Sequence, residues 1–455
     1  MTHVAVIDIG KTNAKLALVD LATGSEIAVV TRPNTVRPGP PYPHFDLEGH
    51  WTFLLDGLAR FHAAHRIDAI SVTTHGASAV LLDADGALAT PMLDYEHDGP
   101  DSLRADYDAI RPDFALTGSP RLPGGLNLGA QLHWLFARDP GLHARTDAIL
   151  TYPQYWGFRL TGVRATDVTS LGCHTDLWCP DDGAVSPLVG APGIADRLAP
   201  PMRPMDRLGP LLPAVAARTG LPPDTPVVCG IHDSNASLYP HLIAREAPFS
   251  VVSTGTWVVA LAVGGADVPL DPARDTLVNV AANGQPVRSA RFMGGRSFDL
   301  LTAGTDRDPA AEDIAAVLAQ EMMLLPAVVS GSGPFPQAKA AWINGEPAVG
   351  SGRRGAATAF YLALMTQTCL SLIGADGPTI VEGAFARNAA FLSMLAAATG
   401  RPVIATASQT GTSLGAALLV AEGGTAPMAE DRVILPPGPS WTRYAARWQA
   451  AAARR

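Results

Sequence analysis

One local pattern occurs twice in this chain, and it limits the folds that the chain can adopt. Residues 3–8 and 14–20 are apolar runs rich in β-branched residues, and the small and polar residues 9–13 separate them. This pattern predicts a β-hairpin with a tight turn. Residues 250–263 repeat it around a second Gly/Thr turn, Ser253–Thr256. We therefore predict a duplicated architecture in which the two turns face one another.

Helices and strands alternate along the rest of the chain. The patterns predict strands at residues 28–30, 69–74, 226–230, 379–381 and 403–405, and helices at 51–64, 356–374, 388–399 and 412–421. This alternation is typical of α/β proteins with a mainly parallel sheet. We expect the tail after about Ala445 to be a frayed helix.

Length and composition narrow the class of protein. The chain has 455 residues, 47% of them apolar and 16% charged, which is enough for large cores in two or three domains. The turn-rich segment 217–226 predicts a boundary between one domain at 1–225 and another at 226–455. A net charge of −9 argues against binding to nucleic acid or anionic lipid. No long apolar window, secretory signal or disulfide framework is apparent, so we expect a cytoplasmic protein without a membrane segment.

The first turn carries an unusual pair of lysines. Only three of the 33 basic residues are lysines, and two of them are Lys11 and Lys15. A compact ammonium suits a phosphate in a tight loop better than the planar fork of arginine. Gly10 permits close backbone approach, and turn N–H groups with Thr12 and Asn13 can bind phosphate oxygens. An ordinary hairpin turn, with a lysine pair of purely compositional origin, is the alternative.

Aspartates stand at the ends of two predicted strands. Asp8 ends the strand before the first turn, where it is well placed for Mg²⁺, usually through water. Asp233 follows His232 at the end of a second apolar strand, and Ser234 continues into a predicted helix. A carboxylate at the carboxyl end of a strand can act as a general base. Asp233 could equally be a helix N-cap and nothing more.

Three other stretches have less specific patterns. Gly255 and Thr256 in the second turn form another candidate phosphate site. Small residues in Glu382–Asn388 and Thr412–Ala417 would let a flat ring lie against backbone between two helices, although close helix packing explains them equally well. No role for Cys173 or Cys179 follows from their spacing, because a fourth zinc ligand is missing.

In order and spacing, these stretches resemble the FGGY family of carbohydrate kinases, within the sugar kinase/Hsp70/actin superfamily. The similarity is greatest to the L-rhamnulose and L-fuculose kinases. Asp8–Asn13 resembles the first phosphate motif, Gly230–Ser237 the segment with the catalytic aspartate, Ser253–Trp257 the second phosphate motif, and Glu382–Asn388 the adenosine motif. The resemblance implies two actin-like (ribonuclease H-like) domains of the α/β class with a nucleotide and sugar cleft between them.

The resemblance also implies ATP and Mg²⁺ as cofactors, a small sugar as the partner molecule, and room for a homodimer. We expect Asp233 to be the catalytic base, and Asp8 with Asp233 to hold the metal. The expected ATP contacts are Gly10, Lys11, Thr12, Asn13, Lys15, Gly255, Thr256, Gly383, Ala384 and Asn388. The expected sugar contacts are His75, Gly76, Asp94, Glu96, His232, Asp233 and Ser234, because polar groups at strand ends suit a ligand rich in hydroxyls.

The expected reaction is phosphorylation of the terminal 1-hydroxyl of a small ketose, such as the 6-deoxyketohexoses L-fuculose and L-rhamnulose. Leu93, Tyr95 and Trp156 are candidate apolar walls for the 6-methyl group. A kinase of a pentulose or another polyol is the nearest alternative. A sugar-sensing or chaperone-like ATP-binding protein without turnover is the alternative from another class.

Three positions depart from the family pattern and leave the sugar open. Ala384 replaces the second glycine that the adenosine motif usually has. Leu93–Glu96 stands where many members have a W-x-D-x-R segment over the sugar. Arg291 lies near the position where rhamnulose kinases carry an asparagine that contacts the sugar.

Overall fold

The structure, a computed structural model, describes residues 3–190, 194–305, 308–406, 411–421 and 431–455. Its contacts divide the chain into two compact units. The first unit comprises Met1–Ala244, Val278–Pro286 and Thr410–Pro427, and the second comprises Arg245–Leu277, Val287–Gln409 and Met428–Arg455.

The boundary between the units lies at Ala244/Arg245 and not after residue 225, where the turn-rich segment had placed it. Residues 226–244 stay with the first unit because two short strands in them, β14 (Val227–Val228) and β15 (Ile231–His232), pair in parallel with β6 (Ala69–Thr74). A turn-rich segment marks a loop, but here the chain returns from that loop into the same sheet.

The first unit is built on a mixed seven-stranded sheet of order β13-β14-β6-β1-β2-β3, in which β15 also pairs with β6. Its strands are β1 (His3–Ile9), β2 (Asn13–Asp20), β3 (Ser25–Pro33), β6 (Ala69–Thr74), β13 (Arg207–Gly209), β14 (Val227–Val228) and β15 (Ile231–His232). β1, β2 and β3 form a continuous antiparallel meander, which confirms the predicted hairpin and its third strand.

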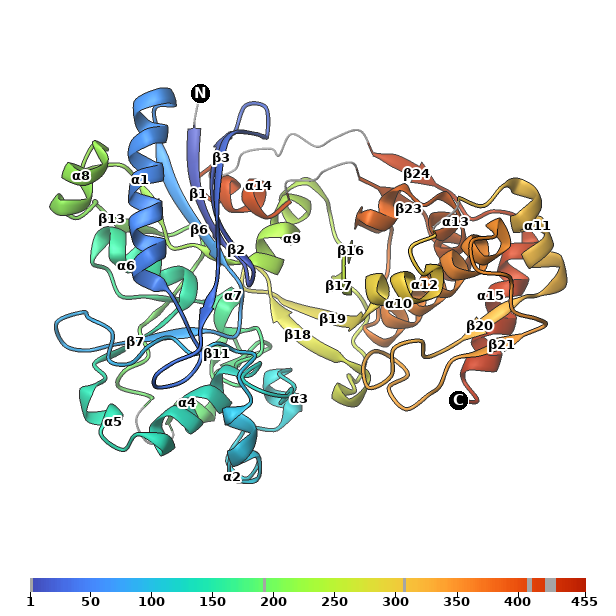
Figure 1. Cartoon of the computed structure of the whole chain (residues 1–455), viewed down its shortest axis with the longest axis horizontal. Coiled ribbons are helices and arrows are strands. Elements are labelled where there is room, and N and C mark those ends of the chain that lie inside the picture. Colours follow the sequence, from blue (N-terminus) through green and yellow to red (C-terminus); the bar gives the residue numbers. More distant parts are fainter. Residues whose placement is uncertain (1–2, 191–193, 306–307, 407–410, 422–430) are drawn as a thin grey trace. The chain divides into compact units, whose positions relative to one another are not determined.

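Helices cover both faces of this sheet. Figure 1 shows α1 along one face, with α9 and α14 against the other. Leu54, Leu58 and Phe61 recur at helical spacing in α1 and are buried with the sheet residues. The helices of this unit are α1 (Leu47–His65), α2 (Arg104–Asp108), α3 (Phe114–Thr117), α4 (Leu128–Arg138), α5 (Leu142–Arg145), α6 (Tyr152–Thr161), α7 (Val168–Leu171), α8 (Pro213–Thr219), α9 (Asp233–Ala244) and α14 (Gly411–Leu418).

Short strands complete the first unit beside the main sheet. They form four pairs: β4 (Val36–Arg37) with β5 (His44–Phe45), β7 (Ala79–Leu82) with β8 (Ala148–Thr151), β9 (Thr166–Asp167) with β12 (Pro201–Met202), and β10 (Trp178–Cys179) with β11 (Ala184–Val185).

The second unit repeats the topology of the first. Its seven-stranded sheet has the order β18-β19-β17-β16-β22-β23-β24. β16 pairs antiparallel with β17 and parallel with β22, as β1 does with β2 and β6. The duplication that the two hairpins predict is therefore confirmed. The strands are β16 (Phe249–Thr254), β17 (Val258–Val263), β18 (Thr276–Val280), β19 (Pro286–Phe292), β22 (Thr379–Gly383), β23 (Val403–Ala405) and β24 (Arg432–Ile434), with a separate pair β20 (Met323–Leu325) and β21 (Ala341–Ile343).

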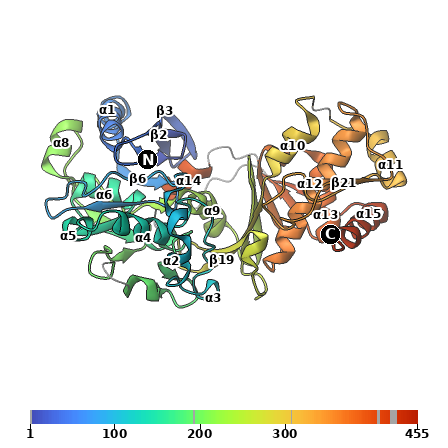
Figure 2. The same ribbon diagram turned by 60° about the horizontal axis from the view of Figure 1, so that its bottom comes forward.

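The helices of the second unit include the C-terminal one that we expected to fray. They are α10 (Gly294–Thr302), α11 (Ala311–Gln320), α12 (Gly352–Leu372), α13 (Ala389–Thr399) and α15 (Pro439–Ala452), and Figure 2 shows α13 and α15 next to each other. The expectation of a frayed tail was wrong. Tyr444 and Trp448 are buried, and the Trp448 indole donates a hydrogen bond to the carbonyl of Leu324 (2.6 Å). These two aromatic side chains hold the helix in the core.

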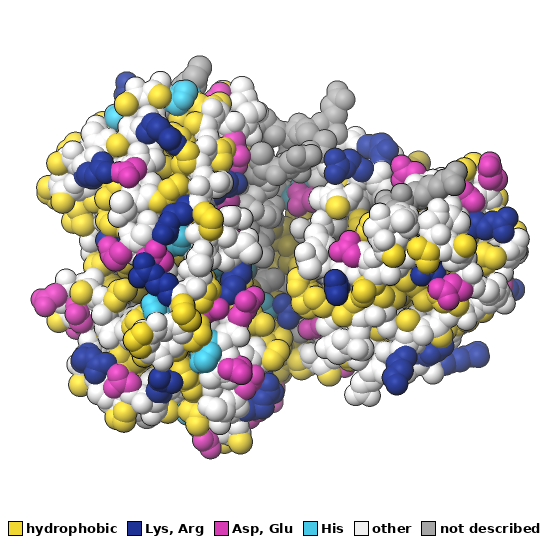
Figure 3. All heavy atoms as spheres, viewed as in Figure 1, with side chains coloured by type: hydrophobic (Ala, Val, Ile, Leu, Met, Phe, Trp, Pro, Cys, Tyr) yellow, Lys and Arg dark blue, Asp and Glu magenta, His cyan; other side chains and the backbone are white. Residues whose placement is uncertain are grey.

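The surface drawn in Figure 3 carries acidic and basic side chains side by side, without a broad patch of either sign. Among the described helices, none combines the length and the apolarity needed to span a bilayer.

Candidate active site

A cavity of about 360 Å³ opens at the first hairpin turn. Its lining consists of Asp8, Gly10, Thr12, Asn13, Lys15 and Thr31. The turn closes with a hydrogen bond of 2.9 Å from the Gly10 N–H to the Asn13 carbonyl. The antiparallel register then sets Lys15 opposite Asp8, with the ammonium 3.2 Å from an Asp8 carboxylate oxygen. The structure thus brings together four of the five predicted ATP contacts of this segment, and Lys11 is the exception.

Asp8 lies at the centre of this end of the first unit. Burial raises the pKa of its carboxyl, the charge of Lys15 lowers it, and the charge of Asp233 raises it again. The Ser413 hydroxyl, from α14, donates a hydrogen bond of 3.4 Å to Asp8. Asp8, at the end of β1, and Asp233, at the start of α9, are thus near enough for their charges to influence one another.

Asp233 opens α9 directly after β15, and its side chain is 34% exposed. One carboxylate oxygen lies 3.1 Å from Nε2 of His232 and accepts a hydrogen bond of 2.6 Å from the Ser234 N–H. An N-cap aspartate accepts from the residue two or three positions later, whereas Asp233 accepts from the next one. Asp233 therefore lacks the hydrogen bond of an N-cap residue, and its catalytic role stays a prediction.

His232 connects Asp233 to a buried thiol that the sequence did not assign. Burial lowers the pKa of His232, but Cys173 and Asp233 raise it, to a net value of about 9. Burial raises the pKa of the Cys173 thiol. His174 and His232 lower it by more, so that the net pKa of Cys173 is about 5. Cys173 and His232 are thus a buried pair in which each group favours the charged form of the other. Sequence spacing could not reveal this pair, because the packing of β15 against α7 brings together residues 59 positions apart.

His75 lies at the end of β6 among three aromatic rings. Its ring centroid is 5.0 Å from those of Tyr95 and Tyr152 and 5.3 Å from that of Phe45. Burial lowers its pKa to about 4, so the imidazole is neutral at pH 7. Nδ1 lies 3.1 Å from the Gly76 carbonyl, and Nε2 has no hydrogen-bond partner among the residues that the structure describes. With the proton on Nδ1, Nε2 is a buried acceptor that a ligand hydroxyl can satisfy.

Gly76 joins His75 to the Asp233 side of the site. A Cβ atom at Gly76 would lie 2.7 Å from Nε2 of His232, so only a glycine leaves this ring in place. The predicted sugar contacts His75, Gly76, His232, Asp233 and Ser234 therefore form one continuous group.

The Lys11 side chain lies near His75, because both contact the ring of Tyr95. Its ammonium pairs with Asp94 and, at 3.1 Å, with Glu96, and it lies over the rings of Phe45 (5.2 Å) and Tyr95 (4.8 Å). We call these five residues the Lys11 cluster. Asp94 is buried, whereas the Glu96 side chain is 62% exposed.

Two of the three expected apolar walls do not face a site. Trp156 is fully buried and packs against Tyr155 and Trp51, and Leu93 is 2% exposed in the core beside α4. Both side chains belong to the hydrophobic core instead, Trp156 as part of α6 and Leu93 in a loop that bridges to His44. Tyr95 remains half-buried beside His75.

The second turn also closes through the N–H of its glycine, but with a hydrogen bond that spans one residue fewer than in the first turn. The Gly255 N–H donates to the Trp257 carbonyl (2.9 Å), and the Gly295 N–H at the start of α10 lies 3.1 Å from the Gly255 carbonyl. Arg291 lies over the Trp257 ring at 4.8 Å, which gives this arginine a structural partner. Gly255 and Thr256 are both exposed.

The predicted adenosine motif forms a tight bend after β22. Gly383 has φ +79°, and a Cβ there would lie 2.2 Å from the Thr254 carbonyl oxygen, so glycine is required. Ala384 begins a short 3₁₀ turn, Ala384–Arg387. Asn388 caps α13 by accepting from the Phe391 N–H (2.9 Å), and its carboxamide N–H₂ remains as a donor.

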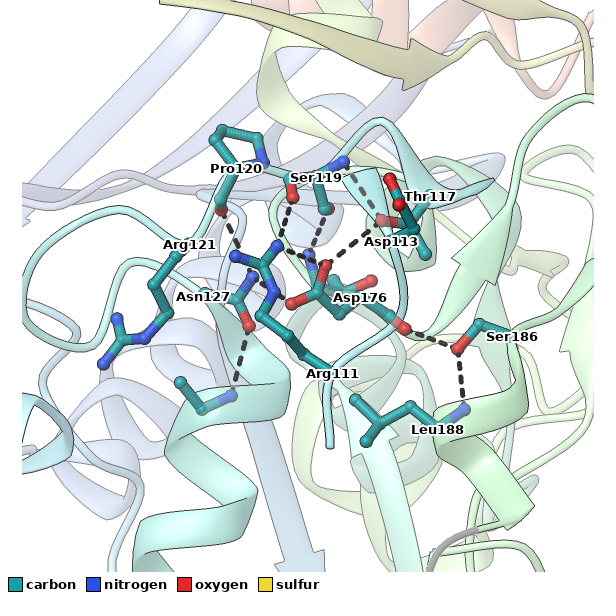
Figure 4. Close-up of polar contacts among 12 residues, drawn as sticks. Arg111, Asp113, Thr117, Ser119, Pro120, Arg121, Asn127, Asp176, Ser186 and Leu188 are labelled. Carbon is teal, nitrogen blue, oxygen red and sulfur yellow. Dashed lines mark hydrogen bonds and ion pairs between the residues drawn. The ribbon is translucent and has the colours of Figure 1, made fainter. Parts of the chain in front are cut away.

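A buried carboxylate supports the loop behind the Lys11 cluster, and sequence reasoning missed it. Asp176 is fully buried, and four side chains bond to it at 2.8 to 3.1 Å: Tyr107, Arg111, Thr117 and Asn127. Figure 4 shows Arg111, Thr117 and Asn127 converging on it. The Gly125 N–H in the same loop donates to the Tyr95 carbonyl (2.9 Å). The partners lie 49 to 69 residues from Asp176 in the sequence, so no local sequence pattern predicts these contacts.

A duplicated α/β fold with a Gly/Thr hairpin turn in each unit defines the actin-like class. The family model described as "FGGY family of carbohydrate kinases, N-terminal domain" matches residues 3–239, and "Carbohydrate kinase FGGY, C-terminal domain" matches residues 246–428. The chain belongs to the FGGY family of carbohydrate kinases.

Individual relatives place the chain within this family. A carbohydrate kinase from Novosphingobium aromaticivorans, of known structure, is 40% identical, with a TM-score of 0.91 over 98% of this chain and 100% of that chain. L-fuculokinase from Escherichia coli K12 is 26% identical over 57% of this chain and 56% of that protein. The chain thus matches little more than half the length of this curated relative. Plasmodium falciparum glycerol kinase, solved with ADP, is 14% identical with a TM-score of 0.81 over 100% of this chain and 98% of that chain, a likeness of fold alone.

Proposed function

We propose that this protein transfers the γ-phosphate of ATP to the terminal 1-hydroxyl of a small ketose. The observation that carries the proposal is the arrangement around Asp233. A partly exposed carboxylate, held by His232 and Ser234, carries a charge that interacts with that of Asp8 in the cavity at the first turn, and the unsatisfied Nε2 of His75 belongs to the same group of residues. Membership of a carbohydrate kinase family supports the same reaction.

In the proposed reaction, Asp233 accepts the proton of the sugar hydroxyl as the hydroxyl oxygen attacks the γ-phosphorus. The bond from that phosphorus to the bridging oxygen of ADP breaks, and the products are a sugar phosphate and ADP. A general base of this kind contributes about 10²- to 10⁴-fold to the rate. His232, protonated at neutral pH, donates to Asp233 and holds the carboxylate in place.

The phosphate contacts that we propose are Gly10, Thr12, Asn13 and Lys15 of the first unit, with Gly255 and Thr256 of the second. Gly383, Ala384 and Asn388 are the proposed adenosine contacts. Asp8 and Asp233, whose charges influence one another, offer hard carboxylate oxygens, which fits Mg²⁺ bound through water and substrate phosphates. The metal would supply charge neutralisation of the transferring phosphoryl group.

The proposed acceptor is a 6-deoxyketohexose such as L-fuculose. The similarity to L-fuculokinase supports this choice, although it covers 57% of this chain. The rings of Tyr95 and Phe45 beside His75 offer apolar contact for a 6-methyl group. One methyl group in a pocket is worth only about 1–3 kcal/mol, so we expect a modest preference over D-xylulose.

The test is a coupled assay of ADP release with L-fuculose, L-rhamnulose, D-xylulose and glycerol, each checked for a sugar phosphate by ³¹P NMR. We expect turnover that depends on the sugar and is highest with a 6-deoxyketohexose. A higher kcat/KM for D-xylulose would overturn the choice of sugar, and ADP release without any sugar dependence would favour the chaperone-like alternative.

The Asp233→Asn variant tests the mechanism. We expect it to bind ATP and sugar normally and to lose about 10²- to 10⁴-fold in kcat. The exposed Asp224→Asn change, in the loop before β14, is the matched control and should be neutral. Turnover of the Asp233 variant within tenfold of the parent would remove this residue from the mechanism, and a melting curve shows whether the variant is folded.

A further inference from the structure

The structure separates the two lysines that flank the first turn. Lys15 lines the 360 Å³ cavity at the turn and pairs with Asp8 (3.2 Å) and Glu26 (3.1 Å). Lys11, four residues earlier, pairs with Asp94 and Glu96 instead. The two ammonium groups therefore belong to different parts of the site, and a shared role in phosphate binding does not follow from their proximity in sequence.

The Lys11 ammonium is fixed in place from several sides. Two carboxylates and two aromatic faces surround it, and the side chain is 21% exposed. Cation–π contacts of this length favour a cation without using its N–H donors. An ammonium has three donors, so the pairs with Asp94 and Glu96 leave one for a ligand.

The Lys11 cluster is continuous with the proposed transfer site. Tyr95, which lies under the Lys11 ammonium, packs edge-on against His75 at 5.0 Å. Gly76, the next residue, adjoins the His232 ring that contacts Asp233. The buried side chain of His75, whose Nε2 has no hydrogen-bond partner among the described residues, thus touches the cluster through Tyr95 and directly precedes Gly76.

The charge of the cluster sets what it can bind. One ammonium and two carboxylates leave a net negative charge, and Asp233 adds another nearby. Carboxylate oxygens accept from sugar hydroxyls, and the free ammonium donor gives to a hydroxyl oxygen. A ligand carboxylate, by contrast, would meet like charges in a partly buried site, which is unfavourable.

We infer that the Lys11 cluster binds the hydroxyls of the acceptor and selects uncharged polyhydroxy acceptors over acceptors that carry a carboxylate. Lys11 is then a specificity residue for the sugar, whereas Lys15 serves ATP. This inference rests on the proposed kinase function and refines its substrate class.

The test compares Lys11→Met with Lys15→Met, which make the same change at the two positions. With L-fuculose as the acceptor, Lys11→Met should raise KM for the sugar about tenfold or more and leave KM for ATP within about twofold. Lys15→Met should raise KM for ATP and leave KM for the sugar within about twofold. A rise in KM for ATP alone in the Lys11 variant would overturn the inference.

A second arm tests the charge argument with D-gluconate as the acid probe. The parent should prefer L-fuculose to D-gluconate in kcat/KM, and Glu96→Gln should narrow this preference by about threefold or more, because it removes one like charge. Preference of the parent for D-gluconate, or an unchanged ratio in the variant, would contradict the inference.

A binding measurement separates this inference from the kinase proposal. L-fuculose without ATP should raise the melting temperature of the parent and of Lys15→Met but not that of Lys11→Met. If the parent phosphorylates no acceptor, the kinase proposal fails, and the melting shifts still decide whether Lys11 binds the sugar. No shift in the parent, or an equal shift in the parent and the Lys11 variant, would overturn the inference.

Discussion

At the scale of single residues, the charge state of His232 depends on a thiol. Burial disfavours an imidazolium in this position, and Cys173 together with Asp233 outweighs the effect, so that the pKa of His232 reaches about 9. A protonated His232 donates to the Asp233 carboxylate and holds it in one orientation. Cys173 thus acts as a positioning residue through His232.

Replacement of this thiol should change the pH dependence of turnover. In Cys173→Ala, the pKa of His232 falls because burial is no longer opposed by the thiol, and the ring loses its proton at a lower pH. We expect the alkaline limb of the kcat profile to move down by about one pH unit or more, with activity recovered near pH 6.

Cys179→Ala is the matched control, since Cys179 is also buried and lies in β10. Its kcat profile should coincide with that of the parent. Superimposable profiles for the parent and Cys173→Ala would show that the thiol does not govern His232.

At the scale of elements, the contact between α9 and α14 is unusually close. A Cβ atom at Gly415 would lie 1.7 Å from the Ala236 carbonyl oxygen. The backbones can approach this closely only because residue 415 has no side chain. This contact supports both Asp233, at the start of α9, and Ser413, which donates to Asp8.

The change Gly415→Ala should therefore destabilise the protein, although the same change in an open helix stabilises by up to about 1 kcal/mol. We expect a loss of roughly 1–3 kcal/mol, the range for overpacking, measured by urea unfolding. Gly190→Ala, where an added Cβ would meet nothing within 4 Å, is the control and should be nearly neutral. An equal or greater stability for the Gly415 variant would contradict the close packing.

Elements with strong local patterns were predictable, and those set by distant partners were not. The hairpins β1–β2 and β16–β17 follow from apolar runs around small turn residues, which encode the structure locally. Asp233 at a strand end was visible for the same reason. The burial of Trp156, the order of α15 and the Cys173–His232 pair all depend on contacts between distant segments, which periodicity does not record.

At the scale of the whole molecule, two buried histidines make stability depend on pH. Burial lowers the pKa of both His50 and His75 to about 4, from 6.5. Between these values the unfolded chain binds more protons than the folded one, so stability falls as the pH falls from about 6.5 toward 4.

We expect the urea midpoint to be lower at pH 5 than at pH 7, with His75 accounting for roughly 1–2 kcal/mol of the difference. In His75→Asn the difference between the urea midpoints at pH 5 and pH 7 should be smaller than in the parent, whatever the stability of the variant at pH 7. His65 is exposed at the end of α1, and His65→Asn should show the same difference in urea midpoint as the parent. An identical pH dependence in the parent and His75→Asn would exclude His75 as a source.

The return of the chain to its first unit also constrains the order of events during synthesis. The helix α14 contacts β1, β6 and α9, yet it emerges only after most of the second unit has been translated. Its buried side chains include Leu414 and Leu418. The part of this sheet face that α14 covers beside α9 thus stays exposed on the ribosome until residue 411 and those after it have been translated. The first unit therefore cannot be completed in order from its amino end, and a nascent chain released before residue 411 would expose an apolar surface that invites aggregation.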